Sequence, residues 1–165
     1  MLRRVFYSFH YAADCWRLQQ IINMGSIEGQ RIVHSNEWET IERNPEGVKR
    51  WIDGQMIGKS CVVVLIGSHT ATRPWVTYEI CKAWNEGKGV LGVHIHGLLD
   101  RERRASFKGA SPFASIPIAG TSWHLSDYVP LYDPPGWDSA EIYSSIKNNL
   151  GNWVEDAVRR RLQAA

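Results

Sequence analysis

The chain has 165 residues, 44% of them hydrophobic and 22% charged, which is enough for one domain with a full core. Its net charge of +2 is too small for a nucleic-acid-binding surface, which needs a concentrated basic stripe. The chain has no signal-peptide pattern, and no apolar run approaches the roughly 20 residues that span a bilayer, so we expect no membrane anchor. The cysteines, at positions 15, 61 and 81, lack zinc-finger and CxxC spacing. We expect reduced thiols, which favours the cytoplasm.

Predicted strands and helices alternate from the start of the chain. Residues 3–9 are aromatic and β-branched and predict a central strand, followed by a helix over residues 12–22. Residues 29–35 predict a short strand at or near the edge of the sheet. A helix that begins at Pro45 precedes the strand at residues 61–66, whose six apolar residues indicate burial on both faces.

The second half continues this alternation. Pro74 begins the next helix, residues 89–95 form a fourth predicted strand, and residues 128–132 form a last one at the edge. The final helix is predicted to begin after Asp138. Residues 97–126 have no clear period, and an irregular stretch of this length is often a functional lid. This order predicts an α/β fold in which helices cover both faces of a parallel sheet.

The helix after the central strand carries the residues that most suggest a binding site. Trp75, Tyr78 and Glu79 fall at positions i, i+3 and i+4, so two aromatic rings and a carboxylate share one face. This face lies near the carboxyl end of a central strand, where open α/β sheets bind ligands. The chain contains neither GxGxxG nor GxxxxGK[ST], so a Rossmann phosphate turn and a P-loop are not indicated.

Seven segments, taken in order, resemble the TIR-like domain family typified by the TIR protein of the Thoeris anti-phage system: FYSFHY, SNEWETI, RWIDGQM, VVVLIGS, WVTYEI, GVLGVHIHGLLD and VPLYD. The most specific of them, Trp75-Val76-Thr77-Tyr78-Glu79, resembles the Trp-x-x-x-Glu motif of TIR domains that cleave NAD. The resemblance implies one TIR-like domain over residues 1–165, with a flavodoxin-like three-layer sandwich of about five parallel strands. The chain departs from ordinary TIR domains after Ile32, where the family usually has a longer mobile loop.

The resemblance also implies a site. Glu79 occupies the position of the catalytic glutamate, and Ser8, Phe9, His10 and Tyr11 lie in the loop that contacts nucleotide. In that family the product is a cyclised or linear ADP-ribose signal that activates a separate effector protein. NAD⁺ is therefore the expected substrate, no further cofactor is expected, and a homo-oligomer is compatible with the family.

The chemistry of NAD⁺ explains why one carboxylate is sufficient. Its leaving group is a pyridinium, which departs without a general acid, and a nearby anion such as Glu79 stabilises the positive charge that develops on the ribose. Phe9 or Trp75 can stack on nicotinamide or adenine, and Ser68 follows the central strand, where a phosphate or ribose would lie. If residues 97–126 exclude water as a lid, a ring nitrogen of adenine can capture the ribose and give a cyclic product.

Simpler interpretations exist for several of these residues. Glu79 on an amphipathic helix is by itself more often solvated, and Trp75 is as consistent with a core anchor as with a substrate contact. His94 and His96 could begin a metal site, but no third ligand stands at suitable spacing, so we expect no metal. The basic residues at 101–104 are interpreted as a solvated loop.

Two other functional classes are compatible with the predicted fold. A phosphorelay receiver needs a phosphoacceptor aspartate at the end of the third strand, where this chain has Gly67 and Ser68, so that class is disfavoured. A non-catalytic TIR-like module that acts by self-association is the remaining alternative, because the fold does not fix the function.

Overall fold

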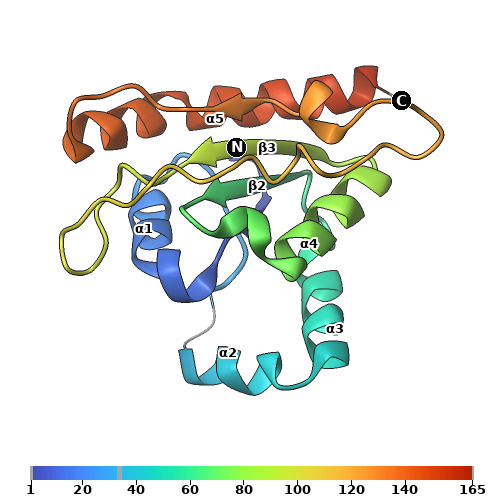
Figure 1. Ribbon diagram of the computed structural model, residues 1–165, viewed down its shortest axis with the longest axis horizontal. Helices are drawn as coiled ribbons and strands as arrows, with labels where there is room; N and C mark the ends of the chain where they lie inside the picture. Colours follow the sequence, from blue (N-terminus) through green and yellow to red (C-terminus); the bar gives the residue numbers. More distant parts are fainter. Residues whose placement is uncertain (1, 33–34, 165) are drawn as a thin grey trace.

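Strands and helices alternate along the chain in a computed structural model of the protein, which describes residues 2–32 and 35–164 (Figure 1). The strands are β1 (Val5–Ser8), β2 (Cys61–Ile66), β3 (Gly89–His94) and β4 (Leu131–Tyr132). The α-helices are α1 (Tyr11–Asn23), α2 (Ser35–Glu42), α3 (Pro45–Met56), α4 (Pro74–Asn85) and α5 (Ser139–Gln163), and the 3₁₀ turns are η1 (Thr70–Thr72) and η2 (Leu125–Asp127). Helices α3, α4 and α5 begin where the sequence predicts.

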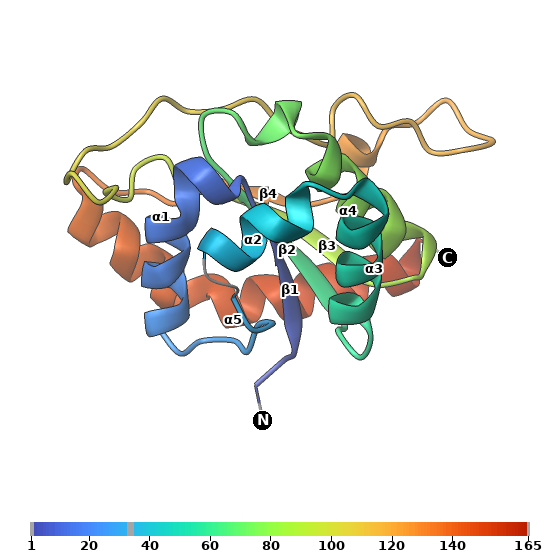
Figure 2. The same cartoon turned by 90° about the horizontal axis from the view of Figure 1, so that it is seen from below.

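The sheet is parallel throughout, in the order β1-β2-β3-β4. Helices α1 and α5 pack on one face, and α3 and α4 pack on the other (Figure 1). In the view of Figure 2, α2 lies between α1 and α3. This arrangement confirms the predicted α/β, flavodoxin-like sandwich with helices on both faces. The expected number of about five strands was wrong, because the sheet has four.

The missing strand is the one predicted over residues 29–35. Residues 29–32 are irregular, residues 33 and 34 lie outside the described part of the chain, and α2 already begins at Ser35. Among the described residues, a single parallel bridge between Arg4 and Glu28 continues the sheet beyond β1. The β-branched character of this segment therefore did not lead to strand pairing.

A glutamine side chain takes the place of that strand. The backbone N–H of Tyr7 donates to Oε1 of Gln30 over 2.8 Å, and Nε2 of Gln30 donates to the carbonyl of Tyr7 over 3.0 Å. The amide thus supplies the donor and the acceptor that a neighbouring strand would supply. Gly29 lets the chain approach this closely, since a Cβ there would lie 2.1 Å from the Tyr7 ring.

Replacing Gln30 with leucine should destabilise the fold by about 1–3 kcal/mol, because the buried N–H and C=O of Tyr7 lose their partners. Urea denaturation of Gln30→Leu against the native chain measures this loss. Gln163→Leu makes the same change at an exposed position of α5 and should stay within about 0.5 kcal/mol of the native chain. Equal stability of the two variants would contradict the strand-replacing role of Gln30.

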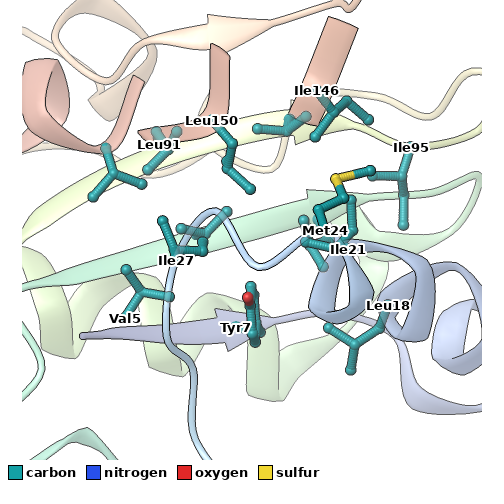
Figure 3. Close-up of a cluster of buried hydrophobic side chains, with 14 of the residues drawn as sticks. Val5, Tyr7, Leu18, Ile21, Met24, Ile27, Leu91, Ile95, Ile146 and Leu150 are labelled. Carbon is teal, nitrogen blue, oxygen red and sulfur yellow. The ribbon is translucent and has the colours of Figure 1, made fainter. Parts of the chain in front are cut away.

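Two hydrophobic clusters fill the spaces on either side of the sheet. Figure 3 shows the cluster beneath α1 and α5, in which Leu18 and Ile21 of α1 and Ile146 and Leu150 of α5 pack on side chains of the strands. The opposite cluster joins α3 and α4 to the alternate side chains of the same strands. Within the described ranges, no helix is both long enough and apolar enough to cross a membrane.

The segment predicted as a lid, residues 97–126, packs on the core at several points. Phe113 is fully buried in the cluster beneath α3 and α4, and Ile116 and Leu125 join it there. Gly109 packs so closely on the chain after β2 that a Cβ would lie 2.0 Å from the carbonyl oxygen of Gly67. Packing therefore holds the segment at these points, while side chains between them, such as Phe107, remain exposed.

Candidate active site

A large cleft opens beside the carboxyl end of β1, with a volume of about 960 Å³. It is lined by α1 with the residues that precede it, and by Ile32 together with Trp38 and Glu42 of α2. Residues 73–79 complete the cleft, and the turn at residues 100–102 lies at its rim. This volume is at the upper end of the range for small-molecule sites, so the cleft can accept a ligand as large as a dinucleotide.

Glu79 is the acidic group held in this cleft. It lies on the second turn of α4, which packs against β1, β2 and β3, and only 7% of its surface is exposed. The hydroxyl of Ser8, at the end of β1, donates a hydrogen bond to Oε2 of Glu79. Burial raises the pKa of Glu79 to about 8, and the hydrogen bond from Ser8 opposes this rise. A carboxyl group with a pKa this high is typical of functional sites.

Aromatic rings form a wall that shares the cleft with Glu79. Tyr11 stacks on Trp38 with ring centroids 5.6 Å apart and an interplanar angle of 17°, and Phe9 lies 5.9 Å from Tyr11. Behind this wall a small cavity of about 30 Å³ reaches Glu79 and Trp51, which is space for about one or two water molecules. The wall offers flat apolar surface beside a carboxyl group.

Cationic and titratable groups border the same cleft. His10 lines the cleft. Burial lowers the pKa of His10, and so do the nearby charge of Arg73 and the neighbouring His69. His10 is therefore neutral at pH 7, and its Nδ1 is buried without a hydrogen-bond partner in the described part of the chain. Arg73 and Arg101 supply positive charge suited to phosphate groups.

The structure brings together most of the residues that the sequence indicates. Phe9, His10, Tyr11 and Trp75 line the cleft together with Glu79. Ser8 is fully buried and contacts Glu79 instead of facing the cleft.

Ser68 does not line the cleft. After β2 the backbone N–H of Gly67 donates to Oγ1 of Thr70, which closes a tight turn at this point. Asp14 of α1 packs against Gly67 so closely that a Cβ there would lie 2.2 Å from its Oδ2. The turn and this contact leave Ser68 outside the pocket wall.

Sequence reasoning did not identify the second wall or the rim. Trp38 lies in the segment SNEWETI, whose helical character was evident, but nothing in the spacing indicated that its ring would stack on Tyr11. Arg101 belongs to a basic cluster interpreted as a solvated loop, and it is exposed, yet it also lines the rim of the cleft. A tryptophan on a short polar helix was the available signal for the wall.

The two histidines considered for a metal lie elsewhere. His94 and His96 have ring centroids 5.7 Å apart and line a separate cavity of about 280 Å³ together with Asp133. Lys108 pairs with Asp133 over 2.6 Å, which engages that carboxylate. Within residues 2–32 and 35–164, no three ligand-type side chains are grouped as a metal site would require.

The sequence is similar to those of known proteins. The profile of a family described as "Thoeris protein ThsB, TIR-like domain" matches residues 6–100, which include most of β1 and the whole of α4 with Glu79. A protein of Bacillus cereus (strain MSX-D12) named "Putative cyclic ADP-D-ribose synthase ThsB1" is 33% identical in an alignment of 119 residues, and the match covers 68% of this chain. The match spans 62% of the length of that relative.

Proposed function

Because the chain belongs to the TIR-like domain family of the Thoeris protein ThsB, we propose that it cleaves NAD⁺ between nicotinamide and ribose and makes a cyclic or linear ADP-ribose-type signal. The observation that carries this proposal is the buried carboxyl group of Glu79, held by Ser8 in a cleft of about 960 Å³. The motif around Glu79 and the name of the Bacillus cereus relative support it.

The bond that breaks joins C1′ of ribose to the ring nitrogen of nicotinamide. The electron pair of this bond returns to the pyridinium nitrogen, so neutral nicotinamide departs without taking up a proton. The ribose is left as an oxocarbenium-like cation, which the ionised carboxylate of Glu79 stabilises from the adjacent wall. Neutral His10 adds no positive charge near the developing cation.

The fate of the cation depends on which nucleophile reaches C1′. Attack by water gives linear ADP-ribose and a proton, whereas attack by an acceptor atom of the same molecule gives a cyclic product. The stacked rings of Tyr11 and Trp38 exclude water from one side of the site and favour a folded substrate with stacked bases. In this proposal the product leaves the cleft and activates a separate effector protein, and NAD⁺ acts as substrate with no additional cofactor.

Incubation of the purified chain with NAD⁺ tests the proposal directly. Free nicotinamide should appear, and mass spectrometry should identify its partner as linear or cyclic ADP-ribose. If the purified chain is silent, lysates of phage-infected cells that contain it should accumulate the same product. The absence of the product from both preparations would contradict an NAD⁺-cleaving role.

Self-association without catalysis is a second candidate, favoured by exposed aromatic side chains outside the cleft. Trp137 is 98% exposed and Phe107 is 88% exposed, and aromatic residues are enriched at protein interfaces. Sedimentation analysis of the native chain and of Trp137→Ser would reveal an oligomer that depends on this surface. An oligomer that forms without any nucleotide cleavage would favour this candidate.

A further inference from the structure

We propose that Ser8 is a positioning residue, which holds the carboxyl group of Glu79 in one orientation and does not itself contact the substrate. This inference rests on the proposed function, since it concerns the same site. It differs from the role that the family resemblance implies for Ser8, which is contact with nucleotide.

Ser8 is separated from the cleft by its own neighbours. It is the last residue of β1 and is 0% exposed, whereas the three residues that follow it all line the cleft. Side chains alternate along a strand, so Ser8 points to the same face as Phe6, which packs in the cluster beneath α3 and α4. The hydroxyl therefore faces α4, where it meets Oε2 of Glu79.

No other described residue shares this task. Among the described residues, Ser8 is the one whose side chain forms a hydrogen bond with the carboxyl group of Glu79. The amide of Gln30, which lines the small cavity beside Glu79, is already engaged by the backbone of Tyr7.

The charged and titratable groups around Glu79 come from every wall of the cleft. They are His10, Tyr11, Cys15, Glu42, Arg73, Asp100, Arg101 and Glu102. None of them forms a hydrogen bond or ion pair with Glu79 among the described contacts. The orientation and the charge state of Glu79 therefore depend mainly on its burial and on Ser8.

One bonded oxygen has two consequences for the carboxyl group. A hydrogen bond to Oε2 fixes the side-chain rotation of Glu79 and leaves Oε1, which has no partner in the described part of the chain, available to the ribose. It also favours the ionised form over the neutral form, against the effect of burial. Both effects increase the fraction of molecules that are ready to stabilise the ribosyl cation.

Ser8→Ala should therefore lower kcat for nicotinamide release by about 10- to 100-fold at pH 7, with little change in KM. If the hydroxyl of Ser8 bound the substrate equally in the ground state and the transition state, its removal would raise KM and leave kcat unchanged. The pKa of Glu79 should rise in Ser8→Ala, so the acid limb of the pH profile should move to higher pH. A pure rise in KM or an unshifted pH profile would overturn the proposal.

Carbon-13 NMR of labelled glutamate carboxyl groups tests the same idea without turnover. Glu79→Gln identifies the signal of Glu79, and its titration should shift upward in Ser8→Ala. Ser106→Ala removes another hydroxyl, which has no described partner, and should leave that titration unchanged. Ser8→Cys replaces the hydroxyl with a larger thiol, which is a weaker donor, and should shift the titration in the same direction by less.

These measurements separate this inference from the proposed function. A shifted titration in a chain that cleaves no NAD⁺ would support the positioning role and reject the reaction. An unchanged titration in both Ser8 variants would reject the positioning role, whether or not the native chain is active.

Discussion

Glu79→Gln should lower the rate of nicotinamide release by at least about 10²–10³-fold, because the amide cannot supply the negative charge that stabilises the ribosyl cation. Glutamine has nearly the same shape, so it can occupy the buried site of Glu79 and accept the hydrogen bond from Ser8 through its carbonyl oxygen. The chromatographic assay for free nicotinamide measures the effect. The loss should appear in kcat more than in KM, since the interaction strengthens as charge develops.

Glu86→Gln is the matched control for this substitution. Glu86 follows α4 and pairs with Lys82 at the surface, so it carries the same chemical change away from the cleft. Its turnover should equal that of the native chain. Undiminished turnover in a folded Glu79→Gln chain would remove Glu79 from the mechanism.

Glu79 should also make both stability and activity depend on pH. Its pKa rises from an ordinary value of 4.5 to about 8, so between these values the folded chain retains a proton that the unfolded chain has released. The contribution of Glu79 to the free energy of unfolding is thus largest at low pH and declines as pH rises through about 8. Glu79→Gln should flatten that decline in urea denaturation at a series of pH values. In the native chain kcat/KM should increase as pH rises through the same region.

Arg17→Met should destabilise the fold by about 3–5 kcal/mol, because it leaves Asp14 as an uncompensated buried acid. Arg17 and Asp14 face each other within α1 over 2.9 Å, with side-chain exposures of 4% and 1%. The guanidinium also donates to the carbonyls of Leu98 and Arg104, over 2.8 and 3.0 Å. These bonds secure the turn that forms the rim of the cleft, so we also expect a higher KM. Urea denaturation and the nicotinamide assay measure the two effects.

A double substitution tests whether the loss comes from the unpaired acid. Asn in place of Asp14 removes the buried charge, so Asp14→Asn combined with Arg17→Met should recover part of the stability lost in Arg17→Met alone. Arg159→Met removes a surface partner of Asp156 and should cost less than about 1 kcal/mol. If Arg17→Met is no more costly than Arg159→Met, the buried pair contributes little.

The helices and buried strands were predictable because their determinants are local. Six successive apolar residues define β2, and prolines at the first helical position define the start of α3 and α4. The edge strand predicted over residues 29–35 did not form, because a long-range contact took precedence. Pairing of the Gln30 amide with the Tyr7 backbone depends on the approach of two distant segments, which residue preferences do not encode.

The candidate site was predictable to the extent that it lies at strand ends. Glu79 and the residues after Ser8 meet where the carboxyl ends of parallel strands suggest. The different place of Ser8 was implicit in the alternation of β1, since Ser8 and Phe6 share a face that packs against α4. The stacking of Trp38 on Tyr11 could not be predicted in this way, because it depends on how α2 packs against the start of α1.

The closure of β1 by a side chain bears on how copies of this protein can associate. At the β1 edge of the sheet, the side-chain amide of Gln30 pairs with the backbone of Tyr7 and adds no further backbone donors and acceptors. At the opposite edge, β4 pairs with β3 through two residues. Neither edge of the sheet offers a long exposed strand to which another chain could add a strand by β-augmentation. Filaments or rings of this protein would therefore have to be joined through helices and loops, with each sheet remaining separate.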